Sequence, residues 1–153
     1  MKNLKLYIAH NFHDRHKIRK IELRIEADFK IELDNPFYDN DRNDIEALDK
    51  LPEGGEEQKA YFRERNTKEM CESIVEGDLD MIRKADGLFT IITAASIGTS
   101  MEIIWAARVL RMPVYIVTKN YYYHPWIQKH ATRRFKTLRE FRQFLTEMGL
   151  KRK

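Results

Sequence analysis

The sequence has a single cysteine, few glycines and prolines, and no apolar run long enough to cross a bilayer. The lone Cys71 excludes a framework of internal disulfides and is typical of the reducing cytoplasm. A spanning helix needs about 20 mostly apolar residues, and a signal peptide needs an apolar segment that the N-terminus lacks. We therefore expect a cytoplasmic protein with no membrane partner.

Several short motifs that mark common chemistries are also absent. The chain has no G-x-G-x-x-G, no Gly-Lys-Ser/Thr and no G-x-S-x-G, which argues against a dinucleotide fingerprint, a P-loop and a serine-hydrolase elbow. His10, His13 and His16 are evenly spaced, but they straddle a loop and the start of a helix, without cysteine pairs or H-E-x-x-H. We expect no metal and no cofactor.

The charge balance is mildly basic. Lys and Arg number 28 against 24 Asp and Glu, for a formal charge of +4 over 153 residues. Much of the excess lies in the last turns and in the tail 151–153, where a solvated basic terminus is the ordinary interpretation. The charge suits an anionic ligand of any size, and the solvated tail argues against a nucleic-acid partner. The length predicts one domain spanning residues 1–153.

The stretch 86–118 organises the chain. Residues 88–93 and 114–117 are short apolar runs rich in β-branched residues, which predicts two buried strands. Residues 101–111 between them are apolar almost all round, as in a buried helix. Strand, helix and strand form the βαβ unit of a parallel sheet, whose ligands bind beyond the carboxyl ends of the strands. Residues 96–102 would lie there, at a helix N-terminus.

The rest of the chain extends this unit. Patterns predict strands at 4–9 and 31–34, an edge strand at 133–136, and helices at 15–28, 67–85 and from 137 onward. Residues 37–66 are polar and poorly patterned but hold four aromatic residues, so we interpret them as a lid or insert. The predicted fold is an α/β three-layer sandwich with a mainly parallel sheet of about five strands, Rossmann-like or flavodoxin-like.

Two carboxylates stand out. Glu102 lies in the first part of the predicted helix beyond the sheet, although Thr99-x-x-Glu102 also fits a capping box. Asp78 falls between Ile74 and Ile82 on the apolar stripe of its helix, where a carboxylate is costly unless it has a purpose; a buried hydrogen bond to a loop is the alternative. Two carboxylates converging on one cleft are what glycosidic chemistry requires.

The small residues that precede Glu102 form a loop of the kind that binds anions. Gly98 permits close backbone approach, and the hydroxyls add donors. The residues are Ser96, Gly98, Thr99 and Ser100.

At these positions the chain resembles the nucleoside 2-deoxyribosyltransferase superfamily, and in motif the 2'-deoxynucleoside 5'-monophosphate N-hydrolases in particular. The matching pieces occur in the family's order, from residue 4 to 118: Leu6-Tyr7-Ile8-Ala9, Phe12-His13-Asp14-Arg15, Asp78-Leu79-Asp80-x-Ile82, Ser96-Ile97-Gly98-Thr99-Ser100-Met101-Glu102 and Pro113-Val114.

The resemblance implies roles for these residues. Glu102 would be the nucleophile at the anomeric carbon, Tyr7 would hold its carboxylate, and Asp78 would orient the sugar or protonate the leaving base. Ser96 stands where deoxyribosyltransferases carry Asp and the N-hydrolases carry Ser, which favours a 5'-phosphate. Further substrate contacts would come from Ala9, His10, Phe12, Asp14 and Arg15.

We therefore expect an N-glycosidase that hydrolyses a (deoxy)nucleoside 5'-monophosphate to free base and sugar phosphate. The alternatives are a deoxyribosyltransferase that exchanges bases and a non-catalytic nucleotide-binding module on the same fold. The resemblance also implies a homodimer or a higher even oligomer.

Overall fold

The computed structural model describes residues 2–39 and 45–153. Its sheet has five parallel strands in the order β2-β1-β3-β4-β5. They are β1 (Leu4–Ala9), β2 (Ile31–Asp34), β3 (Gly87–Ile91), β4 (Val114–Val117) and β5 (Arg133–Phe135). The central strands β1 and β3 are mostly buried on both faces, as expected of a parallel sheet covered on both sides.

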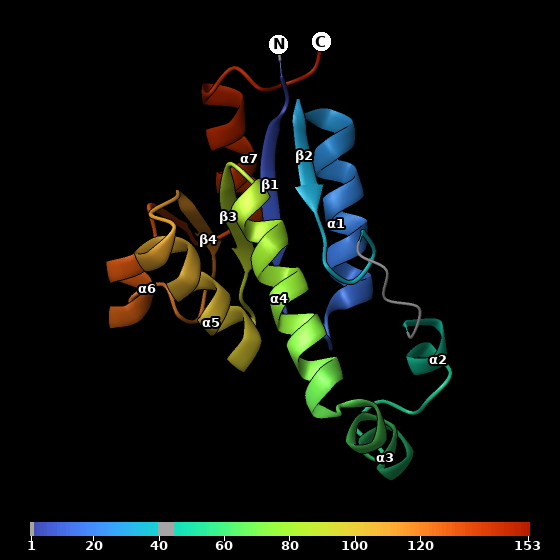
Figure 1. The fold of residues 1–153 in the computed structure, drawn as a ribbon. Helices are drawn as coiled ribbons and strands as arrows, with labels where there is room; N and C mark the ends of the chain where they lie inside the picture. Colours follow the sequence, from blue (N-terminus) through green and yellow to red (C-terminus); the bar gives the residue numbers. More distant parts are fainter. Residues whose placement is uncertain (1, 40–44) are drawn as a thin grey trace.

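Helices cover both faces and make three layers (Figure 1). On one face, α1 (Arg15–Asp28) and α7 (Leu138–Glu147) pack against a core that includes Phe89 stacked on Phe141, with ring centroids 4.1 Å apart. On the other face lie α4 (Lys68–Lys84), α5 (Ile97–Ile104), its π-helical continuation η1 (Trp105–Val109) and α6 (Pro125–His130). The predicted α/β sandwich is confirmed, and its sheet is wholly parallel within the described residues.

Local signals set the element boundaries. Thr67 caps α4 by accepting a hydrogen bond from the Met70 amide at 3.2 Å. Thr137 caps α7 through the Glu140 amide at 3.2 Å, while the Glu140 carboxylate accepts from the Lys136 amide at 2.6 Å. Side-chain oxygens satisfy amides that have no partner within the helix, which is why these sequence signals are reliable.

Three short helices were not expected. Within the 37–66 segment the structure forms α2 (Ile45–Asp49) and α3 (Glu56–Arg65), and the aromatic loop after β4 leads into α6. They carry little apolar periodicity, and α6 begins because Pro125 follows His124, whose ring accepts from the Trp126 amide at 3.3 Å. Residues 40–44 of the expected lid lie outside the described residues.

The apolar stripe predicted for α4 is only half correct. The sequence pattern predicts that Met70, Cys71, Ile74, Val75, Asp78, Ile82 and Ala85 face inward. Ile82 is fully buried and Ile74 half-buried, but Met70, Cys71 and Val75 are exposed. The reason is visible in Figure 1, where the first half of α4 extends past the sheet and has no strand beneath it. No helix in the described ranges is both long enough and apolar enough to span a membrane.

Candidate active site

The strand order places a switch point, where a crevice is expected, at the carboxyl edge between β1 and β3. The chain leaves β1 toward α1 on one face and leaves β3 toward α5 on the other, so the two connections diverge. Ligands of open α/β sheets bind at such a switch point. The two loops meet there, since the Thr93 hydroxyl donates a hydrogen bond to the Asp14 carboxylate at 2.7 Å.

Tyr7 and Glu102 are brought together beneath this crevice. Tyr7 lies on β1 and is fully buried, and its hydroxyl donates a hydrogen bond to Oε2 of Glu102 on α5. Glu102 itself is half-buried. A donor fixed in the sheet restricts the carboxylate to one orientation, which a nucleophile requires.

The capping-box alternative for Glu102 is wrong. The N-cap of α5 is Ser96 and not Thr99, so Glu102 lies in the second turn and reaches across to β1. The Thr99 hydroxyl is buried without a hydrogen-bond partner in the described part of the chain. The carboxylate is therefore held by tertiary structure and does not terminate its own helix.

Asp78 lies on the sheet-facing side of α4. It is half-buried and stands one turn before Ile82, which is fully buried in the same cluster as Tyr7. The sequence predicted a buried carboxylate here, and the structure leaves it partly accessible. Partial exposure suits a group that exchanges a proton with a ligand.

The start of α5 is open to a ligand. Ser96 makes no side-chain cap, and the Ser100 hydroxyl bonds the Ser96 carbonyl at 2.8 Å. Apart from the chain neighbours of Gly98 and the backbone of its own helix, no atom of the described residues lies within 4 Å of the point where a Cβ on Gly98 would be. Backbone amides and the helix dipole at such an end favour negative charge.

Three of these small residues line a hollow beside α5 whose wall does not include Glu102. Ser96, Thr99 and Ser100 line a hollow of about 320 Å³ between α5 and α6. Its far wall carries aromatic rings, from Tyr121, His124 and Trp126. The aromatic run that follows β4 in the sequence is a usable signal for this wall, but nothing local in the sequence marks α6 as a helix that packs opposite α5.

His10 lies in a buried polar network behind the crevice. Its Nε2 is 3.1 Å from Oδ1 of Asn35, and its Nδ1 is 2.8 Å from the Asn11 carbonyl oxygen. Asn35 in turn donates to the buried Glu22 carboxylate at 2.8 Å. Burial raises the pKa of Glu22 to about 7, against the opposing effects of Asn35 and Arg19.

The Arg15 guanidinium is already paired within the protein. Its side chain is 2% exposed, with Nη2 at 2.7 Å from Asp49 and Nη1 at 3.0 Å from Glu53. It also stacks over Phe12 at 3.9 Å. These contacts attach the 45–53 part of the insert to α1, so Arg15 holds the insert in place beside the crevice.

The other residues expected at this loop lie around the crevice. Ala9 is the fully buried last residue of β1, and Phe12 is half-buried with its ring edge-on to Phe62 of α3 at 5.6 Å. Burial opposes ionisation of Asp14, but hydrogen bonds from Thr93 and Asn11 outweigh it and hold the pKa below its ordinary value. Across residues 2–39 and 45–153, no group of three metal-ligating side chains comes together.

Comparison with known proteins shows the fold. No protein-family model matches the chain, and no curated protein matches it. Among solved structures, the chain is similar to a 2-deoxyribosyltransferase from the psychrotolerant bacterium Bacillus psychrosaccharolyticus. The TM-score is 0.60 with 17% sequence identity, over 90% of each chain.

Proposed function

We propose that this protein cleaves the N-glycosidic bond of a nucleoside or nucleotide, with Glu102 as the nucleophile. One observation carries the proposal: the Tyr7 hydroxyl holds the Glu102 carboxylate below the switch point of the sheet. The similarity in fold to a 2-deoxyribosyltransferase supports it, because that protein moves a deoxyribosyl group.

The proposed reaction has two displacements at one carbon. A Glu102 oxygen attacks the anomeric carbon as the C–N bond breaks through an oxocarbenium-like transition state. The bonding electron pair leaves with the base, which takes a proton from Asp78, and a glycosyl ester forms on Glu102. An acceptor, a second base or water, then attacks the same carbon, gives its proton to the Asp78 carboxylate and displaces Glu102, which restores both carboxyl groups. No cofactor is needed.

The fold comparison favours a second base as the acceptor, which makes the reaction a deoxyribosyl transfer. Ser96 favours a second candidate, hydrolysis of a 5'-monophosphate. A hydroxyl and uncapped backbone amides at the start of α5 would bind a phosphate that a carboxylate would repel.

The decisive experiment incubates the protein with ribo- and deoxynucleosides and their 5'-monophosphates, with and without an acceptor base. Chromatography should show base exchange for a transferase, and free base without an acceptor for a hydrolase. Glu102→Gln should lose at least about 10³-fold in turnover with its circular dichroism unchanged. Near-normal turnover of that variant would refute the nucleophile, and nucleotide binding without base release would favour a non-catalytic module.

The Ser96→Asp variant separates the two candidate functions by their substrates, which are nucleoside monophosphates for hydrolysis and nucleosides for base transfer. A carboxylate there should repel a phosphate dianion and lower kcat/KM for monophosphates by about 10²-fold, while nucleosides are spared. Ser96→Ala is the matched control, since it removes the hydroxyl without adding charge. Equal kcat/KM of the wild type for a nucleoside and its monophosphate would leave base transfer as the proposal.

A further inference from the structure

A second cavity lies at the opposite edge of the sheet from Glu102. It occupies about 490 Å³, within the range of small-molecule sites. Its walls come from the end of η1, the 111–112 turn before β4, and the end of α6 with the 131–132 link into β5. These segments precede their strands, so the cavity is at the amino edge, away from the proposed chemistry.

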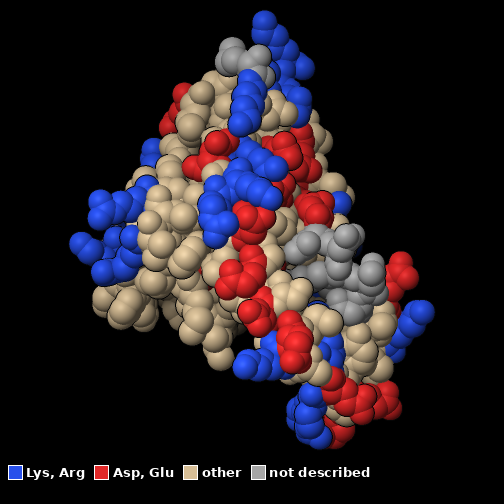
Figure 2. Space-filling view, viewed as in Figure 1, with Lys and Arg blue, Asp and Glu red and all other residues tan. Residues whose placement is uncertain are grey.

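Three cations line this cavity without carboxylate partners. They are Arg108, Arg111 and Lys129, and among residues 2–39 and 45–153 none of them forms an ion pair. The wider segment 105–153 holds twelve Lys and Arg but only two Asp and Glu. In Figure 2, Lys and Arg gather on the α6 side, while Asp and Glu lie along α4, which also carries Lys and Arg at its ends. Three cations placed close together repel one another and raise the free energy of the folded protein, and a bound anion offsets this repulsion.

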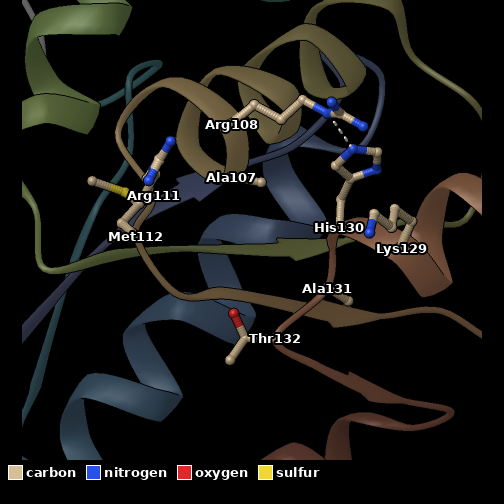
Figure 3. Close-up of a pocket in the computed structure, with 8 residues that line it drawn as sticks. All are labelled: Ala107, Arg108, Arg111, Met112, Lys129, His130, Ala131 and Thr132. Atoms are coloured by element: carbon tan, nitrogen blue, oxygen red, sulfur yellow. Dashed lines mark hydrogen bonds between the residues drawn. The ribbon is translucent and has the colours of Figure 1, made fainter.

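Arg108 is held in position by a buried histidine. Its Nε donates a hydrogen bond to Nε2 of His130 at 2.9 Å (Figure 3). Nδ1 of His130 donates to the Trp126 carbonyl at 2.8 Å. His130 is 9% exposed and its ring stacks on Trp126, with centroids 5.5 Å apart. The bond uses only Nε, so the terminal nitrogens of the guanidinium are left for a ligand.

Arg111 occupies an unfavourable backbone conformation. Its φ is 53°, and it is the non-glycine residue with positive φ in the described ranges. After a helix end, glycine or asparagine takes this conformation at much lower cost. Helix dipoles account for cations in the last turns of η1 and α6, but not for an arginine beyond the end. Strain retained at one residue points to a use for its side chain.

We propose that this cavity binds a polyphosphate group. Two guanidinium groups and one ammonium match two to four negative charges, and guanidinium binds phosphate oxygens in a bidentate manner. The remaining wall has Ala107, Met112, Ala131 and Thr132, with the His130 ring already stacked on Trp126 and no tyrosine or tryptophan ring in the lining to stack a base. The cavity therefore recognises its ligand through the phosphate groups, in inorganic polyphosphate or at the end of a nucleotide.

Calorimetry at low salt tests this with inorganic triphosphate and with a nucleoside triphosphate. Equal affinities indicate that the phosphates alone are recognised, and tighter nucleotide binding indicates that the nucleoside adds contacts at the same cavity. Binding should weaken as salt rises. Arg111→Gly and Lys129→Gln should each weaken it at least tenfold, and Arg24→Gln on the exposed side of α1 should not. Arg111→Gly should also keep or raise Tm, because glycine relieves the strain.

Two further variants separate this cavity from the proposed active site. Ser96→Asp should leave triphosphate binding intact, and Arg111→Gly should leave base release intact. Absence of triphosphate binding at millimolar concentration, or binding lost in Ser96→Asp and kept in Arg111→Gly, would overturn the proposal. So would a short single-stranded oligonucleotide that binds more tightly than triphosphate and depends equally on Arg133 and Arg134, since an extended basic surface would then replace the cavity.

Discussion

A fully buried tyrosine on the first strand determines where the glutamate on α5 points. The two residues are 95 positions apart, and a single hydrogen bond joins them. Burial of the phenol in the sheet means that the donor cannot reorient, so the carboxylate is preorganised before any substrate arrives. At the residue scale, catalysis by Glu102 should therefore depend on one hydroxyl that does not touch the sugar in the proposed reaction.

Tyr7→Phe removes that hydroxyl and keeps the ring. We expect kcat to fall by about 10- to 100-fold with KM nearly unchanged, because the carboxylate is misoriented while the binding surface stays intact. Steady-state kinetics with the substrate identified by base release measures both constants. Tyr115→Phe, a half-buried tyrosine on β4, is the matched control. A fall in Tm without a change in kcat would contradict the positioning role.

Glu22 makes stability depend on pH. Its folded pKa of about 7 exceeds the ordinary 4.5, so the folded state keeps a proton that the unfolded state has lost. The free energy of unfolding should therefore fall as pH rises from about 4.5 to 7, by roughly 2 kcal/mol between pH 5 and 8. Urea unfolding of the wild type and of Glu22→Gln tests this, because the variant should lack that fall. A parallel pH dependence of the two proteins would contradict it.

At the scale of elements, the 45–66 segment is attached to α1 by polar and aromatic contacts. Asp49 and Glu53 hold Arg15 and also lie near His16 and His13, at 3.1 Å in both cases. Phe12 supplies the aromatic part of the attachment through Phe62 of α3. The described part of the insert is thus held against α1 beside the expected crevice. The buried guanidinium that holds it is that of Arg15.

Arg15→Gln should loosen this attachment. It removes two ion pairs and the stacking on Phe12, so we expect a loss of about 1–3 kcal/mol in the free energy of unfolding. Trypsin should also cut faster within residues 50–65, which mass spectrometry of the fragments can locate. Arg24→Gln removes a cation from the exposed side of the same helix and should change neither quantity. Unchanged proteolysis in Arg15→Gln would show that other contacts hold the insert.

At the scale of the whole molecule, apolar side chains remain exposed on neighbouring helices of one face. Ile97 is 81% and Met101 68% exposed on α5, and Val75 is 52% exposed on α4. Exposed apolar residues grouped in this way mark interaction surfaces more often than isolated ones do. A second copy of the chain is the partner we expect, since an even oligomer buries the same patch on both copies.

Light scattering after size exclusion should give at least twice the 18.4 kDa chain mass at micromolar concentration. Met101→Lys should shift the mass toward the monomer, because a charge in an apolar interface loses its hydration without gaining a partner. Leu23→Lys introduces the same charge at an exposed apolar residue of α1 and should leave the mass unchanged. A monomer mass for the wild type would contradict the assembly.

The sequence by itself determined the elements whose signals are local. Periodicity located α1 and α4, β-branched runs located the strands, and Thr67 and Thr137 marked helix starts. Each of these signals acts within a few residues, so no knowledge of the rest of the chain was needed.

Tertiary structure alone decided the rest. α2, α3 and α6 are short and lack a clear apolar periodicity, so their stability comes from packing and not from their own pattern. The resemblance anticipated the pairing of Tyr7 with Glu102, but only the strand order brings the two together. Met70 is exposed because no strand lies opposite it. Arg15 forms two ion pairs because Asp49 and Glu53 of the insert lie opposite it. Opposing surfaces are set by long-range contacts, and local sequence carries no record of them.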